Sequence, residues 1–387
     1  MSPPALLPPR DADGRVRVLL LHNRYRAAGG EERVVDELEG MLRARGHAVA
    51  RLERDSGEAG SVRAARGLLG GGLEPGDVAK AVRLHRADVV HAHNIHPLLG
   101  WRALAAARAG GARTVLHLHN YRLVCAIGVA FRDGAPCYRC HDRNTLPGLR
   151  HRCRGSYAEG LVYAAGLARQ QPRVLEHADA LVAVSGALAE RLGAIGIPRE
   201  RMSVLPNAVR GLAATSHAGE GRYALAAGRL VEEKGFDVAI RAAREAGVPL
   251  RIAGAGPEEP RLHALAAGAD VTFLGRLSNE ALTRERRGAA VLLAPARGDD
   301  PCPMTVIEAL ADGLPVLGSD RGGIPELIGA DAALPVDDAV AWRSALAALW
   351  RDPAARAATG AAALAHVREH HSPDAWYAGL MRVYGAE

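Results

Sequence analysis

Short runs of hydrophobic residues alternate along this chain with longer stretches that have helical periodicity. The first run covers residues 16–22 (VRVLLLH) and leads through a glycine-bearing loop, 23–30, into a helical pattern over 31–45. A continuous apolar run of this kind is typical of a strand buried on both faces of a parallel sheet. Gly46 is placed to end the helix, and the next run, HAVARL at 47–52, predicts a second strand.

The same alternation continues to the C-terminal part of the chain. Further runs follow at 87–94, 113–120 and 178–185, and a second series begins near Arg222. That series contains YALAAGRL, PLRIAGAG, VTFLG, AVLLAPA and PVLGSD, with helical patterns between them that include 304–311. Regular alternation of strand and helix predicts parallel sheets covered by helices. The expected fold class is therefore α/β, with two doubly wound, Rossmann-like domains.

The composition agrees with two folded domains. The chain has 387 residues, of which 48% are hydrophobic and 24% are charged, as in globular proteins. Residues 206–221 are mostly small and polar, as a linker between domains should be. The N-terminal residues lack the pattern of a signal peptide, and no run of about 18 apolar residues occurs. We therefore expect a cytoplasmic protein without a membrane-spanning segment.

The most informative stretch is 299–328, DDPCPMTVIEALADGLPVLGSDRGGIPELI. Together with GRLVEEKGFD at 228–237, IAGAGPEEPRL at 252–262, FLGRLSNEAL at 273–282 and VLPNAV at 204–209, it resembles glycosyltransferase family 4. Members of that family are retaining enzymes with the two-domain GT-B fold. The resemblance extends along most of the chain and implies two Rossmann-like domains facing a cleft, a nucleotide-sugar donor and no metal in catalysis.

Pattern and resemblance together predict three parts. An acceptor-binding domain is expected over 15–208, with a cysteine-bearing insertion at about 121–155. A nucleotide-sugar-binding domain is expected over 209–365. The resemblance implies that the last segment, 366–387, forms a helix that packs back on the first domain.

Three residues are catalytic candidates. Asp300 and Glu308 match the two acids of the family's E-x7-E pattern, with Asp300 where the first acid is usually Glu. The resemblance implies that Glu308 accepts hydrogen bonds from ribose hydroxyls and that the shorter Asp300 reaches hydroxyls of the transferred sugar. His119 stands where the family has a histidine beside the donor sugar, in a segment that reads HN here and usually reads HD. His91 and His93 are interpreted as supporting or packing groups.

A departing diphosphate needs positive charge nearby, from cations or from helix N-termini. Arg229 and Lys234 follow a predicted strand, and Lys234 is one of only two lysines in the chain. The motif GGEERVV lets bare backbone approach an anion, but it lacks the spacing of a dinucleotide-binding loop. The full donor-binding set is Gly29, Gly30, Arg229, Lys234, Gly254, Arg276, Leu277, Pro303, Met304, Thr305, Val306 and Glu308.

Four cysteines form a separate candidate site. Cys125, Cys137, Cys140 and Cys153 have the spacing C-x11-C-x2-C-x12-C within the basic insertion. Four thiolates with one C-x2-C pair suit tetrahedral zinc in a structural site. Free thiols in a cytoplasmic loop fit the same pattern, so both interpretations stay open.

The charge distribution bears on partners. Residues 1–205 carry 30 Lys+Arg against 20 Asp+Glu, and such a basic face attracts nucleic acid, anionic lipid or a phosphorylated substrate. Aromatic residues are only 4% and do not accompany the arginines, which argues against nucleic acid. We expect a retaining transferase that uses a nucleotide sugar, by resemblance a UDP-sugar, and a polysaccharide, lipid-linked or small natural-product acceptor. Peripheral contact with the inner membrane surface fits the basic half.

Two alternatives to a transferase stay open at this point. A nucleotide-sugar epimerase of the same architecture also cleaves a sugar–diphosphate bond. A non-catalytic binding protein is the other.

Overall fold

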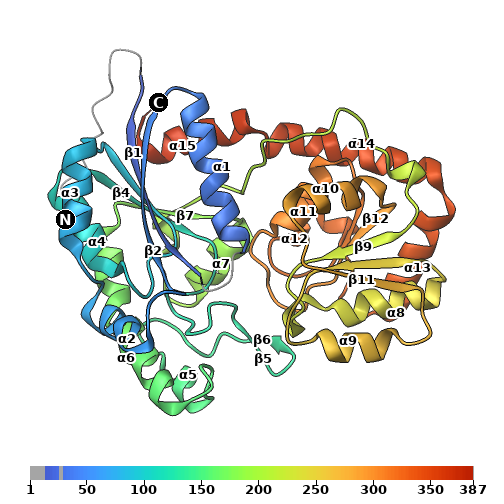
Figure 1. Cartoon of the computed structure of the whole chain (residues 1–387), viewed down its shortest axis with the longest axis horizontal. Coiled ribbons are helices and arrows are strands. Elements are labelled where there is room, and N and C mark those ends of the chain that lie inside the picture. The colour runs from blue at the N-terminus through green and yellow to red at the C-terminus, as the bar shows by residue number, and fades with distance from the viewer. Residues whose placement is uncertain (1–13, 26–28, 387) are drawn as a thin grey trace. The chain divides into compact units, whose positions relative to one another are not determined.

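The computed structural model (Figure 1) describes residues 14–25 and 29–386. These residues form two compact units, each with its own parallel sheet. Unit 1 consists of the described residues up to 130 together with 138–206 and 373–386. Unit 2 consists of 131–137 and 207–372.

Unit 1 is built on six parallel strands in the order β2-β1-β3-β4-β7-β8. The strands are β1 (Arg17–Arg24), β2 (Ala48–Asp55), β3 (Val89–Ala92), β4 (Arg113–Leu118), β7 (Ala180–Ala183) and β8 (Met202–Val204). The helices are α1 (Gly30–Ala44), α2 (Ser61–Gly70), α3 (Pro75–His85), α4 (Gly100–Ala109), α5 (Leu146–Arg150), α6 (Tyr157–His177), α7 (Gly186–Ala194) and α15 (Pro373–Tyr384).

The first strand continues into the segment predicted as a loop. Asn23 and Arg24 pair with Arg54 and Asp55 of β2, so β1 ends two residues later than its apolar run. The reason is that β2 is equally long and offers its backbone to both polar residues. Because β1 lies inside the sheet, its apolar residues from Val18 to Leu21 are almost completely buried.

The two faces of the unit 1 sheet are covered by different helices. Helices α3 and α4 pack against one face, whereas α1 and α15 cover the other (Figure 1). Register places Leu20 of β1 opposite His91 of β3, and His91 opposite Val115 of β4. Since side chains alternate along a strand, His22, His91 and His117 all point to the α15 face.

Unit 2 has five parallel strands in the order β11-β10-β9-β12-β13. They are β9 (Ala224–Ala227), β10 (Leu250–Ala253), β11 (Val271–Gly275), β12 (Val291–Ala294) and β13 (Val316–Gly318). The helices are α8 (Phe236–Ala246), α9 (Glu259–Ala266), α10 (Asn279–Gly288), α11 (Met304–Ala311), α12 (Ile324–Ile328), α13 (Ala339–Arg351) and α14 (Pro353–His370). The predicted α/β class with two doubly wound parallel sheets is therefore confirmed, and α11 has the bounds that its sequence pattern predicts.

The core of unit 2 gathers the buried faces of its helices. Trp342 of α13 is fully buried among β-strand and α8 side chains, and its indole N–H donates to the carbonyl of Pro335 at 3.1 Å. Asp338 caps α13 by accepting from the N–H of Ala341 at 2.9 Å. The amphipathic helices thus bury one face each and leave the strand ends accessible to loops.

A short hairpin, β5 (Phe131–Arg132) and β6 (Ala135–Pro136), belongs to unit 2 although the flanking parts of 121–155 belong to unit 1. Its turn is Asp133-Gly134, with φ of 53° and 79°. Positive φ at both central residues matches the tight hairpin turn that an Asp-Gly pair favours.

Candidate functional site

The predicted donor residues of unit 2 follow the carboxyl ends of its strands. Arg229 and Lys234 come after β9, Gly254 after β10, and Asp300 after β12. The strand order reverses between β9 and β12, and ligands of open α/β sheets bind at such a reversal. The tertiary structure therefore brings the motifs at 228–237 and 299–328 to one edge of one sheet.

Lys234 and Asp300 are in direct contact at this reversal. The Lys234 ammonium donates a short hydrogen bond to the Asp300 carboxylate, and both side chains are partly buried. Arg229 is more exposed and lies 3.4 Å from the carboxylate of Glu233. The site therefore combines one partly buried cation, paired with Asp300, and a second, more exposed cation, paired with Glu233.

Bare backbone shapes the loops around the ion pair. Gly254 has a φ of 147°, and a Cβ at this position would lie 1.8 Å from the carbonyl oxygen of Gly228. Gly322 has a φ of 57°, and its Cβ would lie 2.3 Å from the carbonyl oxygen of Asp300. The N–H of Gly323 donates to that same carbonyl at 2.8 Å. Gly322 and Gly323 thus form a tight turn that supports Asp300.

Helix α11 begins next to this turn. Pro303 is its N-cap residue and offers no side-chain cap, so the first N–H groups depend on other partners. The N–H of Val306 already donates to the carbonyl of Pro303 at 3.0 Å. Met304 and Thr305 follow the cap directly, where the positive end of the helix dipole favours anions. Of the four predicted residues at this helix start, Met304 and Thr305 therefore have the backbone N–H groups best placed to bind an anion.

Glu308 lies one turn further along α11 in a buried ion cluster. Its Oε2 accepts from Nη1 of Arg286 at 2.9 Å, and Arg286 also donates to Asp312 from Nε at 2.5 Å. The three side chains are 5–7% exposed. A buried carboxylate stays charged at low cost when a cation and hydrogen bonds accompany it. Arg286 therefore orients Glu308.

Sequence reasoning did not find Arg286. It lies on α10, 22 residues before Glu308, in a run of charged residues that reads as a solvated helix face. The usable signal was the pair Glu308 and Asp312, one helical turn apart in apolar surroundings, because two buried acids require a cation.

The last two predicted donor residues follow β11. Arg276 is exposed and Leu277 is half-buried. They lie after the edge strand of the sheet, two strands away from β9. In the described structure they are therefore not neighbours of the Lys234–Asp300 pair along the sheet.

In unit 1 the glycine loop leads into α1. Gly29 is the N-cap residue and Gly30 the first residue of the helix, and both are exposed. The N–H of Gly29 donates to Oε2 of Glu32 at 2.8 Å, and the N–H of Tyr25 donates to Oε1 at 3.0 Å. Burial raises the pKa of Glu32, but the nearby His22, whose Nε2 is 3.7 Å from Oε1, and the hydrogen bonds from these backbone groups outweigh it and hold the pKa at about 2.

Glu31 has the opposite electrostatic character. The Tyr25 hydroxyl donates to its Oε2 at 2.6 Å, and the Asn120 amide donates to the same hydroxyl at 3.0 Å. Burial raises the pKa of Glu31, and the bond from Tyr25 offsets only part of that rise. Arg122 lies over the Tyr25 ring at 4.8 Å. Asn120 and Arg122, which follow His119 in the sequence, thus contact Tyr25 beside the start of α1.

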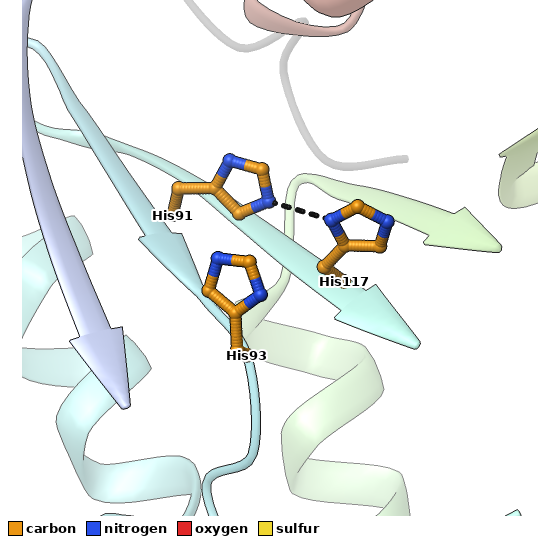
Figure 2. A group of neighbouring side chains, drawn as sticks. All are labelled: His91, His93 and His117. Carbon is orange, nitrogen blue, oxygen red and sulfur yellow. Dashed lines mark hydrogen bonds between the residues drawn. The ribbon is translucent and has the colours of Figure 1, made fainter. Parts of the chain in front are cut away.

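His119 lies in a group of buried imidazoles. Its Nε2 is 2.9 Å from Nδ1 of His93, and burial lowers its pKa well below the ordinary value, with a further lowering from His117. Figure 2 shows the three neighbouring rings of His91, His93 and His117, with a hydrogen bond of 3.2 Å between Nε2 of His91 and Nδ1 of His117. His119 is therefore a neutral imidazole at neutral pH.

The zinc interpretation of the cysteines is not supported. Cys125, Cys137, Cys140 and Cys153 are half-buried, and burial raises the pKa of Cys125. Within residues 14–25 and 29–386, the one group of three or more ligand side chains close enough for a metal consists of histidines. Spacing along the chain alone does not specify whether four sulfurs converge, so the sequence left both interpretations open.

No helix in the described part of the chain has the length and apolar character needed to cross a bilayer.

Family models match both parts of the chain. Residues 28–210 match the model described as Glycosyltransferase Family 4, and residues 221–352 match Glycosyl transferases group 1. The two matches together include most of the chain and all of the candidate site residues. Residues 211–220, between the two matches, are not included. The protein belongs to this glycosyltransferase family, as the motifs of the sequence indicate.

Individual relatives agree with this class. The amylovoran biosynthesis glycosyltransferase AmsK of Erwinia amylovora is 31% identical over 41% of this chain and 44% of its own length. A GDP-mannose-dependent mannosyltransferase of Corynebacterium glutamicum, which acts on a monoacylated phosphatidylinositol monomannoside, is 35% identical over 37% of this chain and 42% of its own length. The chain therefore spans less than half of the length of these curated relatives.

Solved structures share the fold. The UDP complex of Anabaena Alr3699/HepE has a TM-score of 0.65 at 15% identity and covers 96% of this chain and 100% of its own. The fold is therefore GT-B. The epimerase alternative is not favoured, because these two relatives are named as sugar transferases.

The lowered pKa of Glu32 leads to a prediction about how the stability of the fold depends on pH. A carboxyl group whose folded pKa is lowered stabilises the fold above its unfolded pKa of about 4.3, and this stabilisation is lost as pH falls toward the folded value. We expect Glu32→Gln to lower Tm at pH 7 and to approach the wild type near pH 2 to 3. Thermal unfolding across pH measures this, with Glu58→Gln on an exposed acid as control. A Tm difference that stays constant across the pH range would contradict the assignment.

Proposed function

We propose that the protein is a retaining glycosyltransferase that transfers a sugar from a nucleotide diphosphate, in the first instance a UDP-sugar, to a polysaccharide, lipid-linked or small natural-product acceptor. The observation that carries the proposal is the set of groups at the β9/β12 reversal of unit 2. Lys234, Asp300 and the first turn of α11 meet there, and Glu308 is held nearby by Arg286. Family membership and the names of the relatives support the same reaction.

In this proposal the donor diphosphate is bound by cations and by a helix N-terminus. Lys234 and Arg229 approach its oxygens, and the N–H groups of Met304 and Thr305 donate to them. A charge-assisted hydrogen bond is about twice as strong as a neutral one. The diphosphate competes with Asp300 for the Lys234 ammonium, so donor binding releases Asp300 to bind hydroxyls of the transferred sugar.

Glu308 binds the ribose. Arg286 keeps its carboxylate charged and oriented, so it can accept hydrogen bonds from the 2′- and 3′-hydroxyls. Gly254, Pro303 and Val306 shape the backbone around the diphosphate, and Arg276 with Leu277 complete the site on the side of β11.

In unit 1, Gly29 and Gly30 offer exposed backbone at a helix start, and His119 offers a neutral imidazole. We assign Gly29 and Gly30 to binding of the donor diphosphate, and His119 to the hydroxyls of the donor sugar. Bond cleavage develops negative charge on the leaving diphosphate, which Lys234, Arg229 and α11 stabilise. That diphosphate then takes the proton of the attacking acceptor hydroxyl, so the reaction needs no protein base. Since these groups supply the positive charge, the proposed transfer proceeds without a divalent cation.

The function is tested first by donor binding. The purified chain is heated with UDP-, GDP- and ADP-sugars in the presence of a chelator, because a ligand that binds only the folded state raises Tm. We expect one nucleotide class to raise Tm and then to support transfer to an acceptor. Lys234→Ala should reduce kcat/KM for transfer by about 100-fold or more, as loss of an electrostatic stabiliser does.

Lys80→Ala is the matched control for Lys234→Ala. Lys80 is the other lysine of the chain, and it is exposed on α3 of unit 1. Its removal should leave transfer unchanged. A Lys234→Ala enzyme with wild-type kcat/KM, or a chain that no nucleotide sugar stabilises, contradicts the proposed donor site.

Glu308 provides a second test. Glu308→Gln should raise KM for the donor, with a loss of roughly 10- to 100-fold in kcat/KM, because hydrogen bonds to a charged group contribute about 1.5–3 kcal/mol. Glu280→Gln, an exposed acid on α10, serves as control. Equal KM values for the Glu308→Gln variant and the wild type would remove the ribose role.

The proposal also locates the enzyme at the cytoplasmic membrane surface. Residues 101–155 contain ten Lys+Arg and two Asp+Glu. Large apolar side chains near this segment are exposed, with Leu146 at 65%, Tyr157 at 60% and Leu161 at 58%. Peripheral binding combines apolar insertion with attraction to anionic lipid.

Sedimentation with lipid vesicles tests this location. We expect binding to vesicles that contain phosphatidylglycerol, weaker binding at high salt, and little binding to pure phosphatidylcholine. Leu161→Glu should reduce binding, whereas Val340→Glu, exposed on α13 of unit 2, should not. Equal binding of the wild-type protein to both vesicle types would exclude the electrostatic contribution.

A further inference from the structure

Three imidazoles converge on the α15 face of the unit 1 sheet. His91 and His93 belong to β3 and its extension, and His117 belongs to β4. One ring nitrogen of each residue lies within 4.8 Å of the others, and all three side chains are buried (Figure 2). The register of parallel strands produces this convergence, because i and i+2 share a face and neighbouring strands are only about 4.8 Å apart.

The closest pair of nitrogens has the separation of two ligands on one metal. Nε2 of His91 and Nδ1 of His117 are 3.2 Å apart. Two nitrogens at about 2.0–2.1 Å from a tetrahedral ion are about 3.3–3.4 Å apart. Little movement of these two rings is therefore needed, and the ligand nitrogen of His93 lies within 4.8 Å of both.

The outer nitrogens of two rings are already oriented. Nδ1 of His91 is 2.8 Å from the hydroxyl of Tyr384, and Nδ1 of His93 is 2.9 Å from Nε2 of His119. Metal-binding histidines usually bond a second group through the nitrogen that does not bind the metal. The Tyr384 hydroxyl comes from α15, so the C-terminal helix supports the group.

One buried polar atom of the group lacks a partner in the described structure. Nε2 of His93 makes no hydrogen bond. Native proteins contain few buried polar atoms without a partner, and a bound metal ion would supply one here. Burial lowers the pKa of His91 to about 3 and those of His93 and His117 well below the ordinary value, which keeps the rings in the neutral form that binds metals.

We propose that His91, His93 and His117 form a binding site for one divalent transition-metal ion, with zinc, cobalt and nickel as the ions that an all-imidazole set suits. The hydrogen bond between His91 and His117 is replaced by two bonds to the ion. The proton on Nδ1 of His117 leaves for Nε2 of the same ring, so each ligand stays neutral. The site is separate from the proposed donor site, which lies in unit 2.

The ion also acts on His119 through His93. Binding through Nε2 of His93 fixes the proton on Nδ1, and that N–H then donates to Nε2 of His119. His119 consequently keeps its own proton on Nδ1. The metal is thus a structural ion that positions the candidate histidine and takes no part in bond cleavage.

Cobalt(II) absorption and thermal unfolding test the site in the full chain. Protein treated with a chelator and then dialysed should bind one cobalt ion, with visible bands of low coordination number. Zinc chloride at about 100 times Kd should raise Tm by roughly 5–10 °C. His117→Gln and His91→Gln should lose both effects, whereas His263→Gln, an exposed histidine of unit 2, should keep them.

X-ray absorption of the zinc-loaded wild type distinguishes the possible ligands without any variant. Nitrogen and oxygen neighbours only, at about 2.0–2.1 Å, are expected for the histidine site. Sulfur neighbours at about 2.3 Å would assign the ion to the cysteines and overturn the proposal. So would the absence of cobalt bands in the wild type, or a Tm rise that His117→Gln retains. Because donor binding is not involved, this result is independent of the proposed transferase activity.

Discussion

The bond between the Lys234 ammonium and the Asp300 carboxylate joins two loops that are 66 residues apart in the chain. The loops meet because β9 and β12 are neighbours in the sheet, and because the strand order proceeds in opposite directions from this point. Both charges are partly buried, so each needs the other while no ligand is bound. The start of α11 and the turn at Gly322 and Gly323 are arranged around this pair.

In unit 1 the ends of neighbouring parallel strands also bring distant residues together, but the residues that meet there are chemically different. Parallel strands β1, β3 and β4 end at one edge, and histidines lie within two residues of each of these strand ends, whereas glycines and cations follow the strands of unit 2. Burial lowers the pKa of these imidazoles, so this edge of the unit 1 sheet carries neutral rings whose nitrogens can bind a metal or a proton donor. Beside it, Glu32 is charged and Glu31 is buried with a raised pKa, although they are adjacent in sequence. The difference arises because burial dominates at Glu31 and the Tyr25 hydroxyl offsets only part of it, whereas backbone N–H groups also donate to Glu32.

The buried positive charge of Arg286 also explains how Glu308 of α11 can remain a hydrogen-bond acceptor. Glu308 shares Arg286 with Asp312, and the guanidinium satisfies both carboxylates from a neighbouring helix. Removing the cation would leave two buried acids, which is the expensive case for a buried ion pair. The cluster therefore links the stability of unit 2 to the orientation of a residue proposed to hold the ribose.

By itself the sequence determined the α/β class, the family and the stretches that carry chemistry, because strand and helix patterns and local motifs are set by neighbouring residues. The bounds of α11 and the roles of glycines near Asp300 were within its reach for the same reason. Only the tertiary structure decided that Arg286 holds Glu308, that Asn120 and Tyr25 join Glu31, and that three histidines rather than four cysteines converge. Each of these contacts depends on strand order and on which helix covers which face, and spacing along a chain does not encode the distance between side chains on different elements.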